Sequence, residues 1–349
     1  MTSRTDRDWM RRALRLAEKA WGQTSPNPLV GAVVVNDGRA VGEGWHRRAG
    51  LPHAEPEALA AAGAAARGAE LFVTLEPCCT FGRTPPCTEA IRAAGIRRVV
   101  VGCLDPNPKH AGRGIEILRA AGLDVSVGIE AARCRQLNEA FFHWVTTGRP
   151  FVLLKMAMTL DGKIATAAGE SQWVTGPAAR RRVQRLRQWA DAILVGGETL
   201  RQDNPALTVR TPQDWPRQPR KFVWSRRPPT AFPQSLKIFA DPANPPEFVA
   251  PRTPQEWREW LQELGRRPLT ALLLEGGGEL AAAALHAGAV DRLEFHIAPK
   301  ILGGRAGRPV VGGPDPDRLA AALGLQELRF RRLGDDWLAT ARPQPPPQP

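Results

Sequence analysis

Four residues in the first third of the chain have types and spacing that could do chemistry together. His53 and Glu55 belong to a His-Ala-Glu triplet, and Cys78 and Cys87 follow in the stretch LEPCCTFGRTPPC. One imidazole and two thiolates, completed by a water molecule, make a four-coordinate zinc site with one exchangeable position, which is typical of catalytic zinc. A carboxylate two residues from the histidine can carry a proton from that water to a leaving amine. The set predicts hydrolytic deamination of a ring carbon, whose signature is H-x-E followed by P-C-x-x-C.

The second half of this signature is unusual here. Eight residues separate Cys78 from Cys87, in place of two. A glycine and a proline pair within the insert predict a turn that lets Cys87 open the next helix, where the helix dipole favours a thiolate. A strained disulfide between Cys78 and Cys79 is disfavoured, and the chain has no C-x-x-C pair for redox chemistry. We expect Cys79 not to bind the metal, and Cys103 and Cys134 to lie in the core.

Composition limits the class of protein. A chain of 349 residues with only five cysteines predicts two domains with real cores and no disulfide framework. No stretch approaches the ~18 apolar residues of a membrane span, so we expect a soluble, cytoplasmic protein. The net charge is +13, but the arginines are spread along the chain apart from a cluster over 179–188. This distribution favours an ordinary basic surface, or a grip on a phosphorylated small molecule, over nucleic-acid binding.

Strands and helices alternate in both halves of the sequence. Helical spacing runs from Met10 to Trp21, a β-hairpin with an Asn-Asp-Gly turn is predicted over 29–45, and helices and strands alternate afterwards. The pattern restarts with an apolar strand from Phe151. Such alternation predicts an α/β protein with largely parallel sheets covered by helices. The proline-rich segments 211–233 and 241–254 are expected to be irregular.

Seven stretches, in order along nearly the whole chain, resemble the bifunctional deaminase-reductases of riboflavin biosynthesis. The long PC…GRTPPC insert is more specific than the zinc triad, which many deaminases share. The stretches are TSPNPLVGAVVV, GWHRRAGLPHAEPEAL, TLEPCCTFGRTPPC, DPNPKHAGRGIEILRAAG, LKMAMTLDGKIATAAGESQWVTG, DNPALTVR and EGGGELAAAALHAG with the following VDRLEFHIAPKILGG.

The resemblance implies an architecture of two catalytic domains. Residues 1–147 would form a cytidine-deaminase-like α/β/α domain, and residues 148–342 a dihydrofolate-reductase-like α/β domain. A disordered tail would follow over 343–349. The first domain would remove the 2-amino group of a diaminopyrimidinone ribosylamino phosphate, and the second would reduce the ribosyl group to ribityl with NADPH. The implied partner is this phosphorylated pyrimidine, with no nucleic acid and no membrane, and a homo-oligomer is left open.

The resemblance also implies site residues in the first half. His53, Cys78 and Cys87 match the ligands of Zn²⁺, Glu55 matches the proton shuttle, and Asn27 matches a pyrimidine contact.

In the second half Lys155 matches a catalytic position near the sugar oxygens. The motif positions for substrate contacts are Ser171, Arg187, Leu207, Arg210 and Glu275. Those for NADPH are Ala157, Trp173, Thr199, Asp203, Ser225, Gly277 and Gly278. For some of these positions the residue type itself suits the implied role. The amides of a glycine-rich turn that follows a strand and opens a helix can hold a phosphate, and arginines can hold one bidentately.

The sequence departs from the family in three places. Cys79-Thr80 replace a common Ser-His pair, Pro56 follows Glu55 where an apolar residue is usual, and Trp224 stands where Asp often precedes Ser225. Two other readings stay open from the residues alone. One is a nucleic-acid deaminase that uses the basic surface, with an appended binding domain. The other is a structural zinc clamp with a fourth protein ligand, joined to a binding module.

Overall fold

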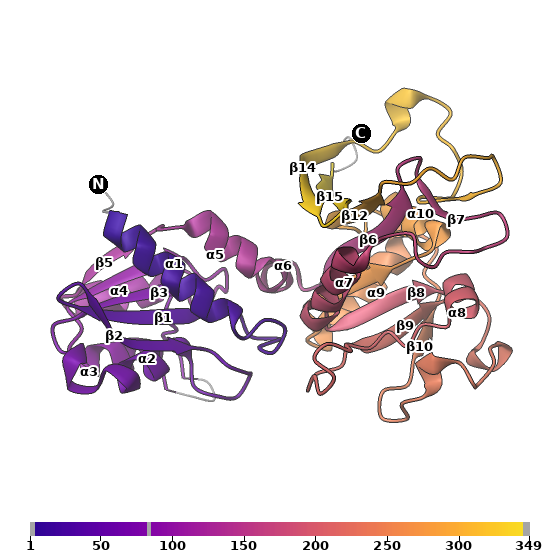
Figure 1. Cartoon of the computed structure of the whole chain (residues 1–349). Helices are drawn as coiled ribbons and strands as arrows, with labels where there is room; N and C mark the ends of the chain where they lie inside the picture. The colour runs from indigo at the N-terminus through magenta and orange to yellow at the C-terminus, as the bar shows by residue number, and fades with distance from the viewer. Residues whose placement is uncertain (1–3, 82–84, 345–349) are drawn as a thin grey trace. The chain divides into compact units, whose positions relative to one another are not determined.

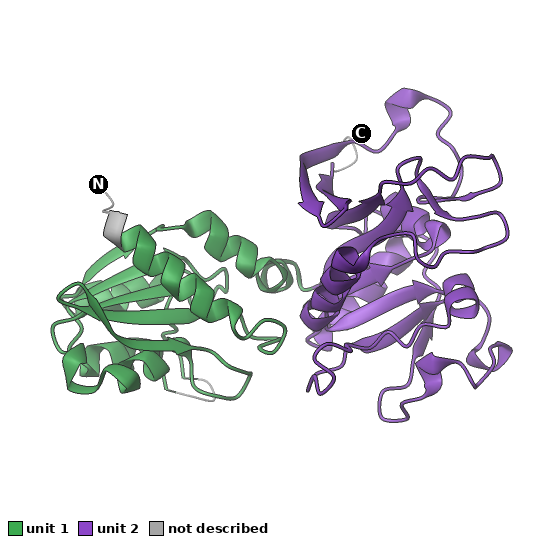
Figure 2. Cartoon of the chain, viewed as in Figure 1, with its two compact units in different colours: residues 1–148 green, residues 149–349 purple. Residues whose placement is uncertain are grey.

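The computed structural model describes residues 4–81 and 85–344. The chain divides into two compact units, Met1–Gly148 and Arg149–Pro349, each with its own sheet and its own core (Figure 2). In the described part of the chain, every helix is too short or too polar to cross a membrane.

Unit 1 is a five-stranded mixed sheet between two layers of helices. The strand order is β2-β1-β3-β4-β5, with β1 antiparallel to β2 and β3, and β3, β4 and β5 parallel to one another. The predicted hairpin and the predicted helix–strand alternation are confirmed, although the first helix ends at Glu18, before Trp21. The elements are α1 (Arg4–Glu18), β1 (Gly31–Asn36), β2 (Arg39–Trp45), α2 (Ala54–Ala62), β3 (Glu70–Leu75), α3 (Cys87–Ala93), β4 (Arg98–Cys103), α4 (Arg113–Ala120), β5 (Asp124–Val127), α5 (Ala131–Leu137) and α6 (Glu139–Thr147).

Alternation along the strands of unit 1 divides the apolar side chains between its two faces. Val34 and Val73 pack with α2, α3 and α4 on one face, while Val33 and Phe72 pack with α1 and α5 on the other (Figure 1). Helices therefore cover both faces of the sheet, and the three central strands, β1, β3 and β4, are buried along almost their whole length.

Two glycines of β2 allow α2 to lie directly on the sheet. A Cβ at Gly42 would lie 2.2 Å from the carbonyl oxygen of Ala58, and one at Gly44 would lie 2.4 Å from that of Ala54. Contacts this short between a Cβ and a backbone atom do not occur in folded proteins, so these positions require glycine. Because α2 begins at Ala54, the glycines also fix the place of His53 and Glu55.

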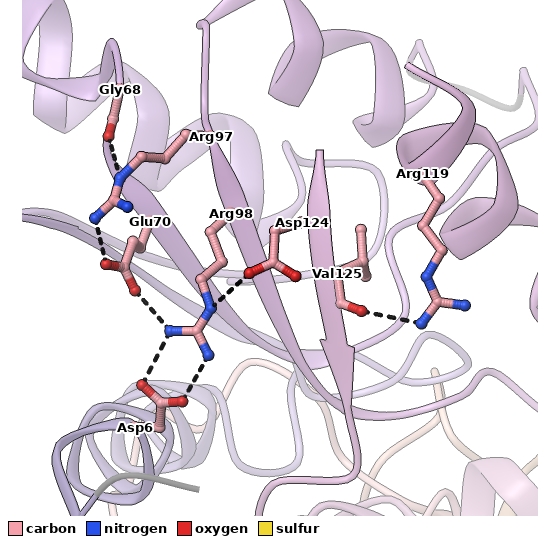
Figure 3. A network of polar contacts seen from close by, with 8 residues as sticks. All are labelled: Asp6, Gly68, Glu70, Arg97, Arg98, Arg119, Asp124 and Val125. Carbon is pink, nitrogen blue, oxygen red and sulfur yellow. Dashed lines mark hydrogen bonds and ion pairs between the residues drawn. The ribbon is translucent and has the colours of Figure 1, made fainter. Parts of the chain in front are cut away.

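An ion-pair network ties the starts of three strands of unit 1 to α1 (Figure 3). Arg98 on β4 donates to both carboxylate oxygens of Asp6 at 3.2 and 2.7 Å and to Glu70 on β3 at 2.8 Å. Its Nε also lies 3.4 Å from Asp124 on β5. Arg97 adds a second contact to Glu70 at 2.6 Å. The network fastens the edge of the sheet opposite the carboxyl ends of these parallel strands.

Unit 2 is an eight-stranded sheet of order β10-β9-β8-β11-β6-β12-β15-β14. The six strands from β10 to β12 are parallel, and β15 and β14 join antiparallel. Its elements are β6 (Phe151–Thr159), β7 (Lys163–Ala165), α7 (Pro177–Trp189), β8 (Ala192–Gly196), α8 (Gly197–Asp203), β9 (Arg220–Trp224), β10 (Glu247–Val249), α9 (Pro254–Arg266), β11 (Ala271–Glu275), α10 (Gly278–His286), β12 (Arg292–Ala298), β13 (Arg308–Pro309), β14 (Leu325–Leu333) and β15 (Asp336–Pro343).

The two faces of the unit 2 sheet differ in character. Val152, Leu154 and Met156 of β6 belong to an apolar core with α9 and α10. The alternate residues of β6 face α7, where the ring of Phe151 meets that of Trp189 edge-on, 6.1 Å between centroids. Lys155 lies on this second face, because side chains alternate along a strand.

Two expectations about irregular segments are wrong. The proline-rich stretches contain β9 and β10, and β9 pairs with β8 over its whole length, so sheet pairing outweighs the flanking prolines. The expected tail began at 343, but Pro343 ends β15 and the amide of Gln344 donates to Gly324 at 2.8 Å. Antiparallel pairing with β14 orders these two residues, and residues 345–349 lie outside the described part.

We predict that Gly44→Val lowers the free energy of unfolding of unit 1 by about 1–3 kcal/mol or more, because overpacking forces α2 away from β2. Urea unfolding of the full chain would measure the change. Glu43→Ala is the matched control: it is the neighbouring residue, and its surface ion pair with Arg12 contributes at most about 1 kcal/mol. Equal losses in the two variants would contradict the packing argument.

Candidate functional site

The predicted ligand atoms of unit 1 meet at one point. His53 is the N-cap of α2, Cys87 is the first residue of α3, and Cys78 lies in the loop after β3. The Nδ1 atom of His53 lies 3.2 Å from the Sγ of Cys87 and 3.5 Å from the Sγ of Cys78. All three ligand atoms lie within 4.8 Å of one another. Residues from three separate segments thus present one nitrogen and two sulfurs to a common centre.

These distances fit a zinc ion. With Zn–N near 2.05 Å and Zn–S near 2.3 Å, tetrahedral geometry separates a nitrogen from a sulfur ligand by about 3.6 Å. The two observed separations, 3.2 and 3.5 Å, are close to this value. Among the described residues, His53, Cys78 and Cys87 are the only metal-ligating side chains that meet in a group of three, and no fourth such side chain lies with them. The donor set is that of a catalytic zinc site, with a position left for water.

Glu55 lies beside this centre in the first turn of α2 and is 3% exposed. Burial, together with the negative charge of Cys78, raises the pKa of the Glu55 carboxyl to about 7. A hydrogen bond from Cys87 lowers the pKa of the Cys78 thiol to about 4, so Cys78 is a thiolate at neutral pH. A carboxyl with a pKa near neutrality can both accept and return a proton.

Asn27 reaches the centre through a histidine that the sequence reasoning missed. The side-chain amide nitrogen of Asn27 lies 3.1 Å from Nε2 of His46, and Nδ1 of His46 lies 3.0 Å from the carbonyl of Pro52. Burial lowers the pKa of His46, which keeps it neutral. Because a carbonyl only accepts, Nδ1 carries the proton and Nε2 accepts from Asn27. The Oδ1 of Asn27 is then the atom that can accept a hydrogen bond from a substrate. His46 belongs to the stretch GWHRRAGLPHAEPEAL, so its place in this family motif could have marked it as a site residue.

The remaining cysteines lie apart from the ligand set. The Sγ of Cys79 lies 3.6 Å from Nδ1 of His110, while Cys103 of β4 and Cys134 of α5 are buried in the core between the sheet and the helices α1 and α5.

Unit 2 contains a cavity of about 1450 Å³ above the carboxyl ends of its parallel strands. Every residue of this half that was predicted to bind substrate or cofactor lines it. These are Lys155, Ala157, Ser171, Trp173, Arg187, Thr199, Asp203, Leu207, Arg210, Ser225, Glu275, Gly277 and Gly278. They come from β6, α7, α8, the end of β11, the start of α10 and the segments that follow β7, α8, β9 and β11. The fold therefore brings positions spread over more than a third of the sequence into one cavity.

A charged pair forms part of the cavity floor. Arg187 donates from Nε and Nη2 to the two carboxylate oxygens of Glu275 at 2.8 and 2.7 Å, and from Nη1 to the carbonyl of Thr208 at 3.1 Å. Burial lowers the pKa of the neighbouring Lys155, while Glu275 acts against that shift. Arg210, by contrast, is an exposed residue of the cavity wall.

The glycine turn before α10 has the shape that a dinucleotide phosphate needs. Gly276 and Gly277 have φ of +88° and +84°, and a Cβ at Gly277 would lie 3.0 Å from the hydroxyl of Thr199. The backbone can therefore approach a ligand at the start of a helix, where amides bind anions. Nearby, the hydroxyl of Ser171 donates to Asp203 at 2.8 Å. The guanidinium of Arg180 lies over the exposed ring of Trp173, 4.9 Å from its centroid. This cavity fits NADPH.

Comparison with known families covers both units. Residues 3–103 match the cytidine and deoxycytidylate deaminase zinc-binding region, and residues 150–339 match the RibD C-terminal domain.

Full-length relatives share both parts in the same order. The riboflavin biosynthesis protein RibD of Synechocystis is 44% identical over 354 residues, 96% of each chain. That of Escherichia coli is 41% identical over 363 residues, 95% of this chain and 97% of the other.

Solved structures agree with these relatives. Acinetobacter baumannii RibD is 36% identical, with a TM-score of 0.88 over 98% of this chain and 99% of that one. The diaminohydroxyphosphoribosylaminopyrimidine deaminase/5-amino-6-(5-phosphoribosylamino)uracil reductase of Thermotoga maritima is 35% identical, with a TM-score of 0.85 over 97% and 99%. The chain therefore belongs to the RibD family and is a bifunctional enzyme of riboflavin biosynthesis, a zinc-dependent deaminase followed by an NADPH-dependent reductase.

Proposed function

We propose that unit 1 deaminates 2,5-diamino-6-ribosylamino-4(3H)-pyrimidinone 5′-phosphate and that unit 2 reduces the ribosyl group of the product to ribityl. The observation that carries the first step is the convergence of His53 and the two cysteine sulfurs beside a buried carboxylate. The observation that carries the second is the gathering of Lys155, the Arg187–Glu275 pair and the glycine turn in one cavity. The chemistry of the Thermotoga maritima enzyme, as its name gives it, supports the same two steps.

In the deamination step His53, Cys78 and Cys87 hold the metal. Zinc, when bound, supplies a Lewis acid that makes a water molecule nucleophilic near pH 7. Glu55 takes a proton from the attacking water and delivers it to the amino group that leaves as ammonia. Asn27, oriented by His46, accepts a hydrogen bond from the pyrimidine through Oδ1, which fixes the ring in front of Glu55.

Glu55→Gln is expected to slow ammonia release by a factor of about 10²–10⁴, because the amide cannot carry the proton. Ammonia release from the full chain would be measured together with the zinc content, which should be unchanged. Reduction of substrate that has already been deaminated should proceed at the wild-type rate.

Glu57→Gln provides the control, since Glu57 lies on the same turn of α2 and pairs at 3.5 Å with Arg47. It should leave ammonia release almost unchanged. Loss of both reactions in a folded Glu55→Gln protein would refute the division of the two steps between the units.

In the reduction step the cavity orders both reactants. NADPH, when bound, supplies a hydride for the sugar carbon C1′. Breaking the bond between C1′ and the ring oxygen leaves an oxygen that needs a proton, and the Lys155 ammonium at the cavity floor is the donor. The exposed Arg210 holds the 5′-phosphate, since Arg187 already donates to Glu275 from Nε and Nη2 and to the carbonyl of Thr208 from Nη1. The other proposed substrate contacts are Ser171 and Leu207, and those for NADPH are Ala157, Trp173, Thr199, Asp203, Ser225, Gly277 and Gly278.

Gly277→Ala should raise KM for NADPH at least tenfold, because the new methyl group strains a backbone with φ of +84° and fills the space next to Thr199. Steady-state oxidation of NADPH with deaminated substrate would measure the change. Gly288→Ala is matched to it: Gly288 also has positive φ, +63°, but a Cβ there meets nothing within 4 Å. Equal KM values for the two variants would argue against a cofactor at the glycine turn.

We also propose that the enzyme binds no nucleic acid, because the anion that it must recognise is the single phosphate of its substrate, for which Arg210 suffices.

We further propose that the enzyme forms a homo-oligomer through β14. The strand β14 lies at the edge of its sheet, and almost all of its residues are exposed, including Leu328 at 54% and Phe330 at 56%. A long edge strand with apolar side chains is a template for pairing with another chain. Glu327 has positive φ and the register with β15 shifts between Gln326 and Arg329, so the regular stretch that a second copy could pair with is Arg329–Leu333, which includes Phe330.

Phe330→Asp is expected to convert the oligomer to a monomer, because it places a carboxylate in the proposed strand pair. Light scattering during size-exclusion chromatography would give the mass. Leu160→Asp, which changes another exposed leucine of the same unit at 66% exposure, should leave the mass unchanged. A monomeric wild-type chain would end the proposal.

A further inference from the structure

Three charged residues stand side by side on adjacent strands of unit 2. In the parallel register Lys155 of β6 is opposite Glu275 of β11 on one side and opposite Glu294 of β12 on the other. Residues in register on neighbouring parallel strands point to the same face of the sheet. The face is the one that α7 covers (Figure 1). Lys155 is therefore a cation between two carboxylates.

Each of these carboxylates has its own arginine from α7. Arg187 binds Glu275 bidentately, and Arg182 binds Glu294 in the same way, at 2.8 Å from Nε and 2.9 Å from Nη2. Charges of alternating sign thus form a row across the sheet, in the order Arg187, Glu275, Lys155, Glu294 and Arg182. Lys155 is the one cation of this row that is not bound bidentately to a carboxylate. Sequence reasoning assigned a role to Arg187 and Glu275 but not to Arg182 or Glu294.

The Glu294 side of the row is sealed from the cavity. Glu294 and His296 are both 0% exposed, and neither they nor Arg182 line the cavity. The Nε2 atom of His296 lies 3.0 Å from Glu294 and donates to it, because the carboxylate only accepts. Burial lowers the pKa of His296, so it stays neutral. Burial opposes ionisation of Glu294, but the bonds from His296 and Arg182 outweigh it and hold its pKa below the usual range.

A sealed carboxylate that is paired this completely cannot touch the substrate. It can only act through Lys155, the neighbouring residue that does line the cavity. We propose that Glu294, held by Arg182 and His296, is a positioning residue of the reductase, which keeps the Lys155 ammonium charged at the cavity floor. This inference rests on the proposed role of Lys155 as proton donor.

The groups around Lys155 act on it with opposite signs. Glu275 from β11 and Glu294 from β12 favour its charged form, whereas burial and Arg187 from α7 oppose it. Arg182 from α7 bears on Lys155 by neutralising Glu294, His296 from β12 is neutral, and Arg210 interacts with Glu275. Removing the charge of Glu294 should therefore make Lys155 lose its proton at lower pH. Removing the charge of Arg182 should do the reverse.

The test compares Glu294→Gln with Arg182→Gln in the full chain. Without substrate or NADPH, the rate at which acetic anhydride acetylates Lys155 would be followed against pH by peptide mass spectrometry. An opposite charge within a few ångströms commonly changes a pKa by about 1–3 units. We expect the midpoint to move down by about one pH unit in Glu294→Gln and up in Arg182→Gln.

The matched control is Asp291→Asn. Asp291 accepts a bidentate pair from Arg149 at 3.0 and 2.7 Å just before β12, so its loss imitates the structural damage without a charge next to Lys155. Its labelling midpoint should equal that of the wild type. Midpoints that move in the same direction in both glutamine variants, or that do not move, would overturn the inference. If Glu294→Gln fails to fold, the labelling midpoint of Arg182→Gln still tests the inference: an upward movement supports it, and an unchanged midpoint overturns it.

Reductase rates against pH separate this inference from the proposed function. A proton donor must be charged, so activity is lost as pH rises through its pKa, and the alkaline limb should follow the labelling midpoint in each variant. KM for NADPH should stay constant, and ammonia release should be unaffected. Labelling midpoints that move as expected while the alkaline limb stays fixed would uphold the charged row and refute Lys155 as the donor.

Discussion

Both sites depend on one constraint of parallel β structure, which is that successive strands end at the same edge of the sheet and helices begin there. In unit 1 this edge collects Cys78 after β3 with His53 and Cys87 at the starts of two helices. In unit 2 it collects Glu275, the last residue of β11, with the glycine turn before α10. Helix starts offer unpaired amides and a positive dipole end, which favour thiolates and phosphates. The same geometry thus suits a metal centre in one unit and a dinucleotide in the other.

Burial affects the ionisation of the carboxyl groups differently in the two sites. In unit 1 burial, together with the negative charge of Cys78, raises the pKa of the Glu55 carboxyl to about 7, although His53 acts against that shift. In unit 2 burial surrounds alternating charges, and Arg187 keeps Glu275 ionised although the carboxylate is almost enclosed. A proton carrier needs the first environment, and a fixed electrostatic row needs the second. Replacing buried charged groups by apolar residues of similar volume is often neutral or stabilising, so burial of these charges is weak evidence for stability of the fold.

Much of this could be predicted from the sequence. The zinc triad has a strong local signature, and the order of strands and helices followed from apolar runs and glycine turns. The positions around the second cavity came from resemblance alone, because no spacing rule connects Ser171 with Ser225. Strands β9 and β10 were missed because the prolines around them carry a local turn signal, whereas the pairing of β9 with β8 and of β10 with β9 is non-local. His46, Arg182 and Glu294 were missed because their roles exist only once register and helix packing bring their partners together.

The separate cores have a consequence for how the enzyme fails under stress. In the described part of the chain, the apolar cluster around Phe222 and Trp257 lies in unit 2, and the clusters around Val34 and Val33 lie in unit 1. Heating such a chain need not produce one cooperative transition, so a single melting temperature would be an average over two events. If unit 2 unfolds first, deamination continues and its deaminated product accumulates, whereas unfolding of unit 1 stops the sequence at its first step.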